Sequence, residues 1–318
     1  QVFTESDLAS LKGEIAIGHC RYSTTGSSTW INAQPTLRPT KYGTIALAHN
    51  GNLTNTAELF DRVRSLEPES SKLGRGATTD TEIMTALIGL QDHETIEENI
   101  VSVLPHLQGA FSLVMMDETT LYAARDLNGV RPLVLGKLEQ GWAVASETAA
   151  LDIVGAEFVR EIEPGEFIAI DNDGVRSQMW GTPNPKGCIF EYVYLARPDT
   201  TIAGQGIHAV RGEIGRTLAI EAPATADLVI PVPESGTPAA IGYAKESGIP
   251  YGLGLVKNSY VGRTFIQPSQ TIRQLGIRLK LNPLREIIEG KRIVVVDDSI
   301  VRGNTQRAIV KMLREAGA

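Results

Sequence analysis

The stretch from Ile293 to Thr305, IVVVDDSIVRGNT, constrains the fold more than any other part of the chain. Ile293 to Val296 are consecutive apolar residues, which is typical of a parallel strand buried on both faces. Asp297 and Asp298 follow at the carboxyl end of that strand, where open α/β sheets bind their ligands. A polar turn containing glycine then leads into a helix. The sequence therefore predicts an α/β unit with a ligand site at this edge of its sheet.

The chain divides into two regions with different patterns. Up to about residue 180, short strands alternate with Gly/Asn turns and a few helices, which suggests a layered α+β sandwich. The segment Trp180–Gly187 is rich in Pro and Gly and is typical of a linker. After it, strands and helices alternate in the doubly wound manner. We therefore predict an α+β domain over residues 1–180 and an α/β domain over residues 187–318.

The expected elements follow from these patterns. In the first domain we expect strands at 14–18, 44–48, 110–116, 120–124, 133–135, 142–146 and 166–170, and helices at 56–66 and 81–90. In the second we expect helix 208–221, strand 227–231, helix 237–247, strand 293–296 and helix 305–316. The chain begins at Gln1 without a Met, and no strand follows its last helix, so we expect it to be truncated at both ends.

Composition narrows the function classes. The 318 residues suffice for two domains with full cores. The net charge of −7 argues against a general nucleic-acid-binding surface. No apolar run approaches the roughly 20 residues that a membrane helix needs. The only cysteines, Cys20 and Cys188, do not form a disulfide framework, so we expect a cytoplasmic protein.

The turn after Val296 suits a sugar phosphate. Backbone N–H groups at a strand–helix turn favour a phosphate, and the side chains of Ser299, Asn304 and Thr305 can add hydrogen bonds. Asp297 and Asp298 can accept from vicinal hydroxyls and bind Mg²⁺ through oxygen. The alternative is a capped turn with solvated acids. Two like charges at the end of a buried strand repel, however, and need a cation or a hydroxyl partner.

Several stretches carry a family resemblance. VVVDDSIVRGNT resembles the phosphoribosyl pyrophosphate (PRPP) loop of type I phosphoribosyltransferases. GCIFEYVYLARPDT, VIPVPESGTPAAIGYA and VKNSYVGRTFIQPSQTIRQLGIRLKLNPL narrow the resemblance to the amidophosphoribosyltransferases. GHCRYSTTGSS and AHNGNLTN resemble the glutaminase domain of N-terminal-nucleophile (Ntn) amidotransferases. The resemblance spans essentially the whole chain and implies an α+β Ntn hydrolase layered sandwich followed by an α/β type I phosphoribosyltransferase domain.

The resemblance implies an activity. Glutamine would be hydrolysed in the first domain, and the ammonia would pass to the second domain. There it would displace pyrophosphate from C1 of Mg-PRPP to give 5-phosphoribosylamine, in the first step of purine nucleotide synthesis. The family also implies purine nucleotides as feedback inhibitors and a homotetramer.

The glutamine site would use four side chains and one backbone group. Arg21 can bind the α-carboxylate bidentately, Asp80 can bind the α-ammonium, and Thr24 can add a hydroxyl contact. The Asn50 side chain and the Gly51 backbone N–H would form the oxyanion hole. Asn-Gly is also a common hairpin signal, so the alternative is a plain turn. The presence of Arg21 and Asp80 favours the oxyanion hole.

The cysteines depart from the family pattern. The family uses an N-terminal cysteine as nucleophile, but the chain starts at Gln1, so we expect it, as given, to lack glutaminase activity. Cys20 is no substitute, because it and His19 would point to opposite faces of a strand. We predict that Cys20 is a small core residue. Cys188 is either a buried thiol at the domain boundary or, by resemblance, one of four ligands to a [4Fe–4S] cluster, which a single thiolate cannot hold.

The resemblance also implies a PRPP site. Ser235, Asp297 and Asp298 would contribute to the Mg²⁺ site, and Gly236 and Thr237 would lie near the pyrophosphate. The 5-phosphate would be anchored by Ser299, Arg302, Gly303, Asn304 and Thr305. The stretch 257–280 would form a cationic lid, with an ordinary basic surface loop as the alternative. Its cations are Lys257, Arg263, Arg273, Arg278 and Lys280.

Two other functions compete with this one. A glucosamine-6-phosphate type of amidotransferase shares the first domain, but VVVDDSIVRGNT argues against it because that family uses a different sugar-phosphate domain. A non-enzymatic PRPP-binding regulator is the second alternative. The nearly complete glutamine site argues against it.

Overall fold

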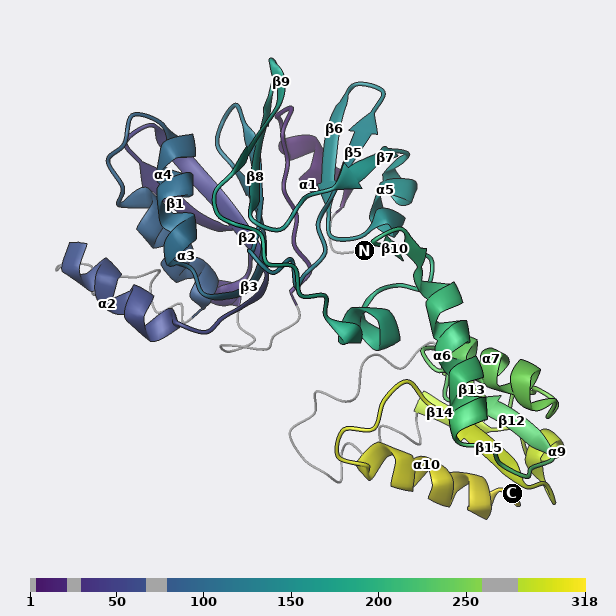
Figure 1. Cartoon of the computed structure of the whole chain (residues 1–318). Coiled ribbons are helices and arrows are strands. Elements are labelled where there is room, and N and C mark those ends of the chain that lie inside the picture. Colours follow the sequence, from purple (N-terminus) through teal and green to yellow (C-terminus); the bar gives the residue numbers. More distant parts are fainter. Residues whose placement is uncertain (1–3, 22–29, 67–78, 259–279) are drawn as a thin grey trace. The chain divides into compact units, whose positions relative to one another are not determined.

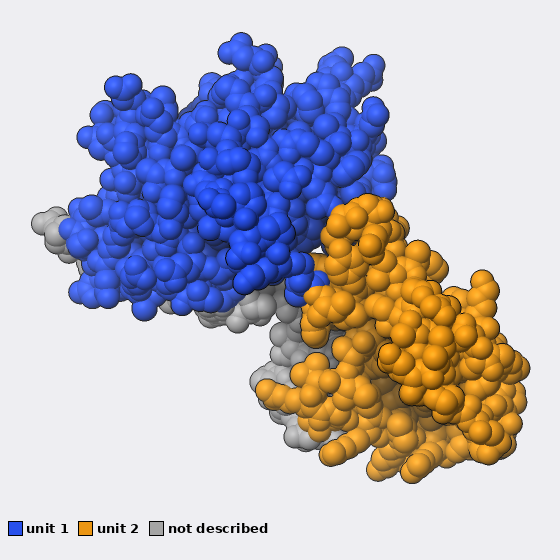
Figure 2. All heavy atoms as spheres, viewed as in Figure 1, with its two compact units in different colours: residues 1–188 blue, residues 189–318 orange. Residues whose placement is uncertain are grey.

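The computed structural model describes residues 4–21, 30–66, 79–258 and 280–318 (Figure 1). The chain divides after Cys188 into two compact units (Figure 2). Unit 1 runs from Gln1 to Cys188 and unit 2 from Ile189 to Ala318. Among the described residues, no helix has the length and apolar character needed to span a bilayer.

Unit 1 contains two antiparallel sheets, a six-stranded one with the order β1-β2-β3-β4-β8-β9 and a three-stranded one with the order β6-β5-β7. Its strands are β1 Thr36–Thr40, β2 Gly43–Leu53, β3 Gly109–Met116, β4 Leu121–Arg125, β5 Val134–Leu138, β6 Gly141–Ala145, β7 Glu157–Glu161, β8 Glu166–Asp171 and β9 Gly174–Met179. Its helices are α1 Glu5–Ser10, α2 Thr56–Leu66, α3 Asp80–Gly89, α4 Ile96–Val103 and α5 Thr148–Val154, with 3₁₀ turns at Trp30–Asn32 and Leu104–His106.

The alternation of side chains along the strands builds the layers of unit 1. On β8, Phe167 faces the core beneath the helices α2 to α4, while Ile168 faces the core between the two sheets. On the outer side of the three-stranded sheet, Leu151 of α5 packs with Val134. The order of layers is therefore helix, sheet, sheet, helix, as Figure 1 shows. This confirms the predicted layered α+β sandwich.

The sequence analysis missed six helices and strands of unit 1, among them α1 and α5, and four of the six have identifiable reasons. The edge strand β1 carries Arg38 and Pro39, and the edge strand β9 is largely exposed and polar; edge strands tolerate such residues. Strand β7 also has an exposed half. Helix α4 could have been found, because Thr95 and Glu98 form a capping box at its start.

Two predictions for the beginning of the chain are wrong. Residues 14–18 form no strand, because no described segment pairs with them, although Ile15 and Ile17 are half-buried between exposed neighbours. Cys20 is exposed rather than part of the core. Its neighbour His19 is half-buried, so the two side chains do differ in their surroundings as alternation predicts.

Unit 2 has the doubly wound pattern, as predicted. Its helices are α6 Ile207–Glu221, α7 Thr237–Ser247, α9 Arg285–Ile288 and α10 Asn304–Glu315, and a π-helical turn spans Glu191–Leu195. Its strands are β10 Thr201–Ile202, β11 Gln205–Gly206, β12 Leu228–Pro231, β13 Leu255–Lys257, β14 Leu281–Pro283 and β15 Ile293–Val296. β12 and β15 pair in parallel, and β13 pairs with β14 antiparallel.

Helices cover both faces of the parallel pair. Ala240 and Tyr243 of α7 pack on Val229 and Val296, while the apolar side of α10 packs on Ile230 at the other face. β15 is less buried than predicted, because among its residues only Val296 is fully buried. Within the described part of the chain, β15 pairs only with β12.

Two glycines let α6 and α7 cross closely. A Cβ on Gly215 of α6 would overlap the carbonyl oxygen of Ala239, and one on Gly242 of α7 would overlap that of Gly212. Backbone atoms cannot move aside as the end of a side chain can. The crossing therefore depends on both glycines.

We expect Gly215→Ala to lower the free energy of unfolding of unit 2 by about 1–3 kcal/mol or more, the usual cost of overpacking. Gly212→Ala is the matched control, because its Cβ would lie 3.9 Å from its nearest neighbour, the carbonyl oxygen of Pro238. In a helix interior that change is neutral or stabilising by about 0.5–1 kcal/mol. Hydrogen exchange of the α6 and α7 amides measures both, and equal effects of the two changes would contradict the prediction.

Candidate functional sites

The carboxyl end of β15 and the loop after β12 form one wall of a pocket of about 540 Å³. Since the strands are parallel and in register, both chains leave the sheet at the same edge. Ser235 from the loop after β12 and Asp297 and Asp298 from the loop after β15 line this pocket, together with residues of α6. The structure thus brings together the three residues predicted for the metal site. Two of them, Ser235 and Asp298, are 63 positions apart in the sequence.

Hydroxyl groups satisfy Asp298. Ser235 Oγ donates to Asp298 Oδ2 at 2.5 Å, and Ser299 Oγ donates to Asp298 Oδ1. Asp297 accepts from the Asp298 backbone N–H at 2.9 Å and from Gln306 Nε2 at 2.9 Å. Asp298 thus has hydroxyl partners and Asp297 has N–H partners, which offset the repulsion between the two like charges.

Gln306 is a site residue that the sequence analysis missed. In addition to Asp297, Gln306 Nε2 donates to the carbonyl oxygen of Ser299 at 3.0 Å, so this side chain connects α10 to the loop. Gln306 could have been predicted, because it lies in the first turn of the helix that follows the end of β15. A polar side chain there can turn back toward the carboxyl end of the strand.

The electrostatics of this wall favour a cation. Burial, with the charge of Asp298 as the second cause, raises the pKa of Asp297. The donor set of two carboxylates and a hydroxyl consists of oxygen only, which suits Mg²⁺, an ion that takes one or two protein carboxylates and completes its shell with water and substrate oxygens. No group of three or more His, Cys, Asp or Glu residues in the described part is arranged to hold a metal by itself.

The helix after the loop begins one residue before the predicted helix 305–316. Gly303, with φ of +71°, is the N-cap of α10, and Asn304 is its first helical residue. No side chain caps this helix start, so no capping side chain would compete with a ligand for its first N–H groups. Thr305 follows half-buried in the first turn, and Arg302 is exposed.

Gly236 permits the two loops to approach each other. A Cβ there would lie 2.5 Å from the carbonyl oxygen of Val296 and 3.2 Å from Asp297 Cα. Thr237 begins α7 directly afterwards. The loop that carries Ser235 can therefore reach Asp298 only with glycine at 236.

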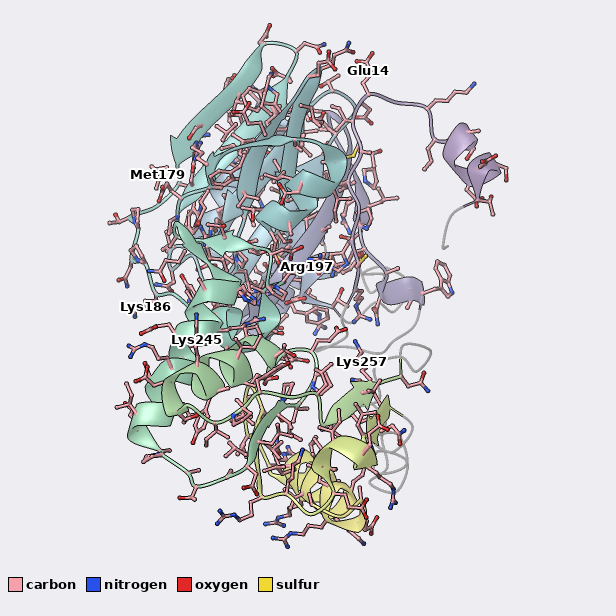
Figure 3. All side chains as sticks on the ribbon, turned by 90° about the vertical axis from the view of Figure 1, so that its right-hand side faces the viewer. Glu14, Met179, Lys186, Arg197, Lys245 and Lys257 are labelled. Carbon is pink, nitrogen blue, oxygen red and sulfur yellow. The ribbon has the colours of Figure 1, made fainter. Side chains whose placement is uncertain are left out.

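The predicted lid lies mostly outside the described residues. That is where Arg263, Arg273 and Arg278 fall. Of its other cations, Lys257 is at the end of β13 (labelled in Figure 3), with Nζ 3.1 Å from Glu234 Oε2. The carbonyl oxygen of Lys280 accepts from the Asn258 backbone N–H at 2.7 Å. The lid stays a prediction.

The raised pKa of Asp297 predicts an effect of pH on stability. The pKa of Asp297 in the folded state is above the ordinary value of 3.8. Ionisation of Asp297 therefore destabilises the folded state at pH values above the folded-state pKa, and this destabilisation disappears below pH 3.8. We expect Asp297→Asn to melt at a higher temperature than the wild type near neutral pH without divalent ions, with a difference that shrinks as the pH falls toward 4. Adding Mg²⁺ should stabilise the wild type more than the variant. A variant that melts lower at neutral pH, or equal stabilisation by Mg²⁺, would contradict this.

A second candidate site lies on β2, next to the edge strand β1 of the six-stranded sheet. β2 runs through to Leu53, so Asn50 and Gly51 are inside a strand, opposite Ser112 and Phe111 of β3. The hairpin-turn alternative for these residues is therefore wrong. Gly51 has φ of +148°, and a Cβ there would overlap the carbonyl oxygen of Ala110. Only glycine at position 51 avoids this overlap.

Asp80 is brought to the same strand by the start of α3. Its carboxylate accepts from the Leu53 backbone N–H at 3.1 Å and lies 3.5 Å from His49 Nδ1. Burial acts to raise the pKa of Asp80, but the hydrogen bond and charge of His49 and the backbone N–H groups of Leu53 and Thr81 outweigh it. The pKa of Asp80 therefore lies below its usual value, and the group is an anion at neutral pH. His49 was not singled out from the sequence, although it stands beside Asn50.

The remaining glutamine-site predictions are only partly covered. His19 Nε2 lies 3.1 Å from the carbonyl oxygen of His49, which brings the segment before Arg21 to β2. Burial lowers the pKa of His19, and the charge of Arg21 contributes. Thr24 lies outside the described residues.

The sequence does not contain the ligands of a four-iron cluster. Cys188 is half-buried at the end of unit 1, and Cys20 is the only other cysteine. A [4Fe–4S] cluster takes four thiolates, so the residues present do not fit it. The iron–sulfur prediction stays a prediction.

Comparisons with known proteins match each unit to a known domain. A glutamine amidotransferase domain model matches residues 19–153, and a phosphoribosyl transferase domain model matches residues 206–318. The amidophosphoribosyltransferase of Mycobacterium tuberculosis is 67% identical over 321 residues, which cover 100% of this chain and 61% of that protein. That of Bacillus subtilis is 48% identical over 320 residues, covering 100% of this chain and 66% of that protein.

A solved structure extends the likeness to three dimensions. The glutamine PRPP amidotransferase from B. subtilis complexed with ADP and GMP superposes with a TM-score of 0.89 at 47% identity, covering 100% of this chain and 68% of that one. This chain therefore joins a glutamine amidotransferase domain to a phosphoribosyltransferase domain in one polypeptide. It belongs to the amidophosphoribosyltransferase family, which excludes the glucosamine-6-phosphate type. The chain spans 61% of the length of its M. tuberculosis relative.

Proposed function

We propose that the protein catalyses the glutamine-dependent amination of PRPP. In unit 1, water and glutamine would give glutamate and ammonia. In unit 2, the nitrogen of ammonia would bond to C1 of PRPP as the C1–O bond to pyrophosphate breaks, giving 5-phosphoribosylamine and pyrophosphate. The product would enter purine nucleotide synthesis.

The observation that carries this proposal is the wall formed by Ser235, Asp297 and Asp298. It supplies hydroxyl-bonded carboxylates for ribose hydroxyls and Mg²⁺ beside an uncapped helix start that favours a phosphate. When bound, Mg²⁺ would neutralise charge on the leaving pyrophosphate. Gly236 and Thr237 would lie beside the pyrophosphate, and the residues 299–305 would hold the 5-phosphate.

Unit 1 supports the glutamine half. Asp80 is ionised and close to β2, as a partner for the α-ammonium must be. Arg21 would bind the α-carboxylate and Thr24 would add a hydroxyl. Asn50 and the Gly51 N–H would stabilise the oxyanion. The nucleophile would be a cysteine other than Cys20 and Cys188.

The family suggests how the protein is regulated and assembled. The B. subtilis relative was solved in complex with ADP and GMP, so we propose that purine nucleotides inhibit this protein as well. A homotetramer and a cytoplasmic location stay predictions.

The test is pyrophosphate release by the full-length protein with Mg²⁺ and PRPP. One assay supplies glutamine and the other supplies ammonia, and Asp297→Asn serves as the variant of unit 2. We expect release with both donors and a loss of at least about 100-fold in the variant, as for removal of a group that stabilises transition-state charge.

Each other outcome has a defined meaning. Release with ammonia alone would show that the glutaminase half does not function. If the folded protein binds PRPP but releases no pyrophosphate with either donor, the enzyme is excluded and the PRPP-binding regulator takes its place.

We expect Asp80→Asn to raise KM for glutamine by about 10- to 100-fold, the cost of losing a hydrogen bond to a charged group. Activity with ammonia should not change, because Asp80 lies in unit 1. Glu82→Gln, two residues further along α3, is the matched control and should leave KM unchanged. An unchanged KM in Asp80→Asn would remove Asp80 from the glutamine site.

A further inference from the structure

A single hydrogen bond connects the candidate oxyanion hole to a distant loop of unit 1. Arg131, in the segment between β4 and β5, donates from Nε to Asn50 Oδ1 at 3.1 Å. The two residues are 81 positions apart. Neither the family resemblance nor the sequence pattern assigned a role to Arg131.

The contact decides which end of the Asn50 amide is a donor. A carboxamide carries an acceptor oxygen and a donor nitrogen on one planar carbon. With the oxygen held by the guanidinium, the nitrogen points the other way. In the flipped orientation, N–H groups of Asn50 and Arg131 would face each other, and an oxygen would face the reacting carbonyl. Such an amide could not stabilise an oxyanion.

We propose that Arg131 is a positioning residue that fixes the Asn50 carboxamide with its N–H₂ group toward the oxyanion. This proposal rests on the proposed glutaminase function. The guanidinium stays charged at all relevant pH values. It also polarises the amide, because a hydrogen bond to one end of a conjugated group strengthens donation from the other.

The structure holds Arg131 firmly enough for this role. Its carbonyl oxygen accepts from Arg125 Nε at 2.9 Å and from Ser112 Oγ at 3.0 Å. Arg125 is buried, and Ser112 stands opposite Asn50 in the pairing of β2 with β3. The neighbouring strands β3 and β4 therefore hold the backbone of the loop that orients the amide of β2.

The second donor of the hole is arranged by the same sheet. Phe111 lies opposite Gly51. Its backbone N–H donates to Asp126 Oδ2 at 3.1 Å, and its carbonyl oxygen accepts from the Asp126 backbone N–H at 2.9 Å. Gly51 and Phe111 are thus a non-hydrogen-bonded pair, and the Gly51 N–H points away from β3. β1 pairs with β2 only as far as Leu47, so it does not reach Gly51. Asp126 lies in the segment that leads to Arg131.

A double-mutant cycle in the full-length protein tests the proposal. Arg131→Met and Asn50→Ala are made alone and together, and kcat and KM for glutamine hydrolysis are measured. We expect Arg131→Met to lower kcat by about 10- to 100-fold, below the loss of about 10²–10³ for removing the donor itself, with KM changed less than about threefold. In the Asn50→Ala background, Arg131→Met should cost less than about twofold.

Controls separate this role from a general loss of structure. Arg131→Lys should recover part of kcat, because lysine keeps the charge and a donor. Arg176→Met removes a partly exposed arginine that pairs with Asp171 and Glu97 in the same unit, and it should leave kcat unchanged. Pyrophosphate release with ammonia should be normal in every variant.

Three results would overturn the proposal. Equal losses from Arg131→Met in both backgrounds would show that Arg131 acts independently of Asn50. A normal kcat in Arg131→Met together with a lowered kcat in Asn50→Ala would exclude the positioning role of Arg131. The proposed function would not be affected by that result. A normal kcat in Asn50→Ala would remove the oxyanion assignment and the role of Arg131 with it.

Discussion

The parallel pairing of β12 with β15 is the constraint on which unit 2 depends. It ends two strands at one edge, so that residues from distant parts of the chain share a pocket wall. Gly236 then allows the following loop to cross within van der Waals reach of the Val296 carbonyl. The hydrogen bond of Ser235 to Asp298 is possible only because of that approach. A half-buried pair of carboxylates becomes tolerable because hydroxyl and amide groups surround it.

In unit 1, an antiparallel strand holds the polar groups of the candidate site. β2 carries Asn50 and Gly51 within a ladder, so the donors are held by the whole sheet and not by a turn. The start of α3 delivers Asp80 to the same strand. Both sites therefore place charged or polar groups at the boundary between a rigid sheet and a helix start. Rigid support of this kind reduces the reorganisation that a reacting group would otherwise need.

Much of this could be predicted from the sequence, and the failures have physical causes. α2, α7 and β15 were predicted at their observed bounds, because each has clear end signals. The strand expected at 14–18 has no pairing partner among the described residues, and pairing is a property of two segments that no single window contains. Gln306 and His49 act through contacts with residues in other elements, which periodicity does not reveal.

By itself, the sequence determined the two fold classes, the division near the Pro/Gly-rich segment and the residue types that suit a sugar phosphate and an amino acid. Local composition and period decide these features, because they depend on neighbours along the chain. Only the tertiary structure decided that HNGN is a strand, that Cys20 is exposed and that Gly303 caps α10. It alone paired Arg131 with Asn50. Such contacts arise from packing between distant segments, which the order of residues does not display.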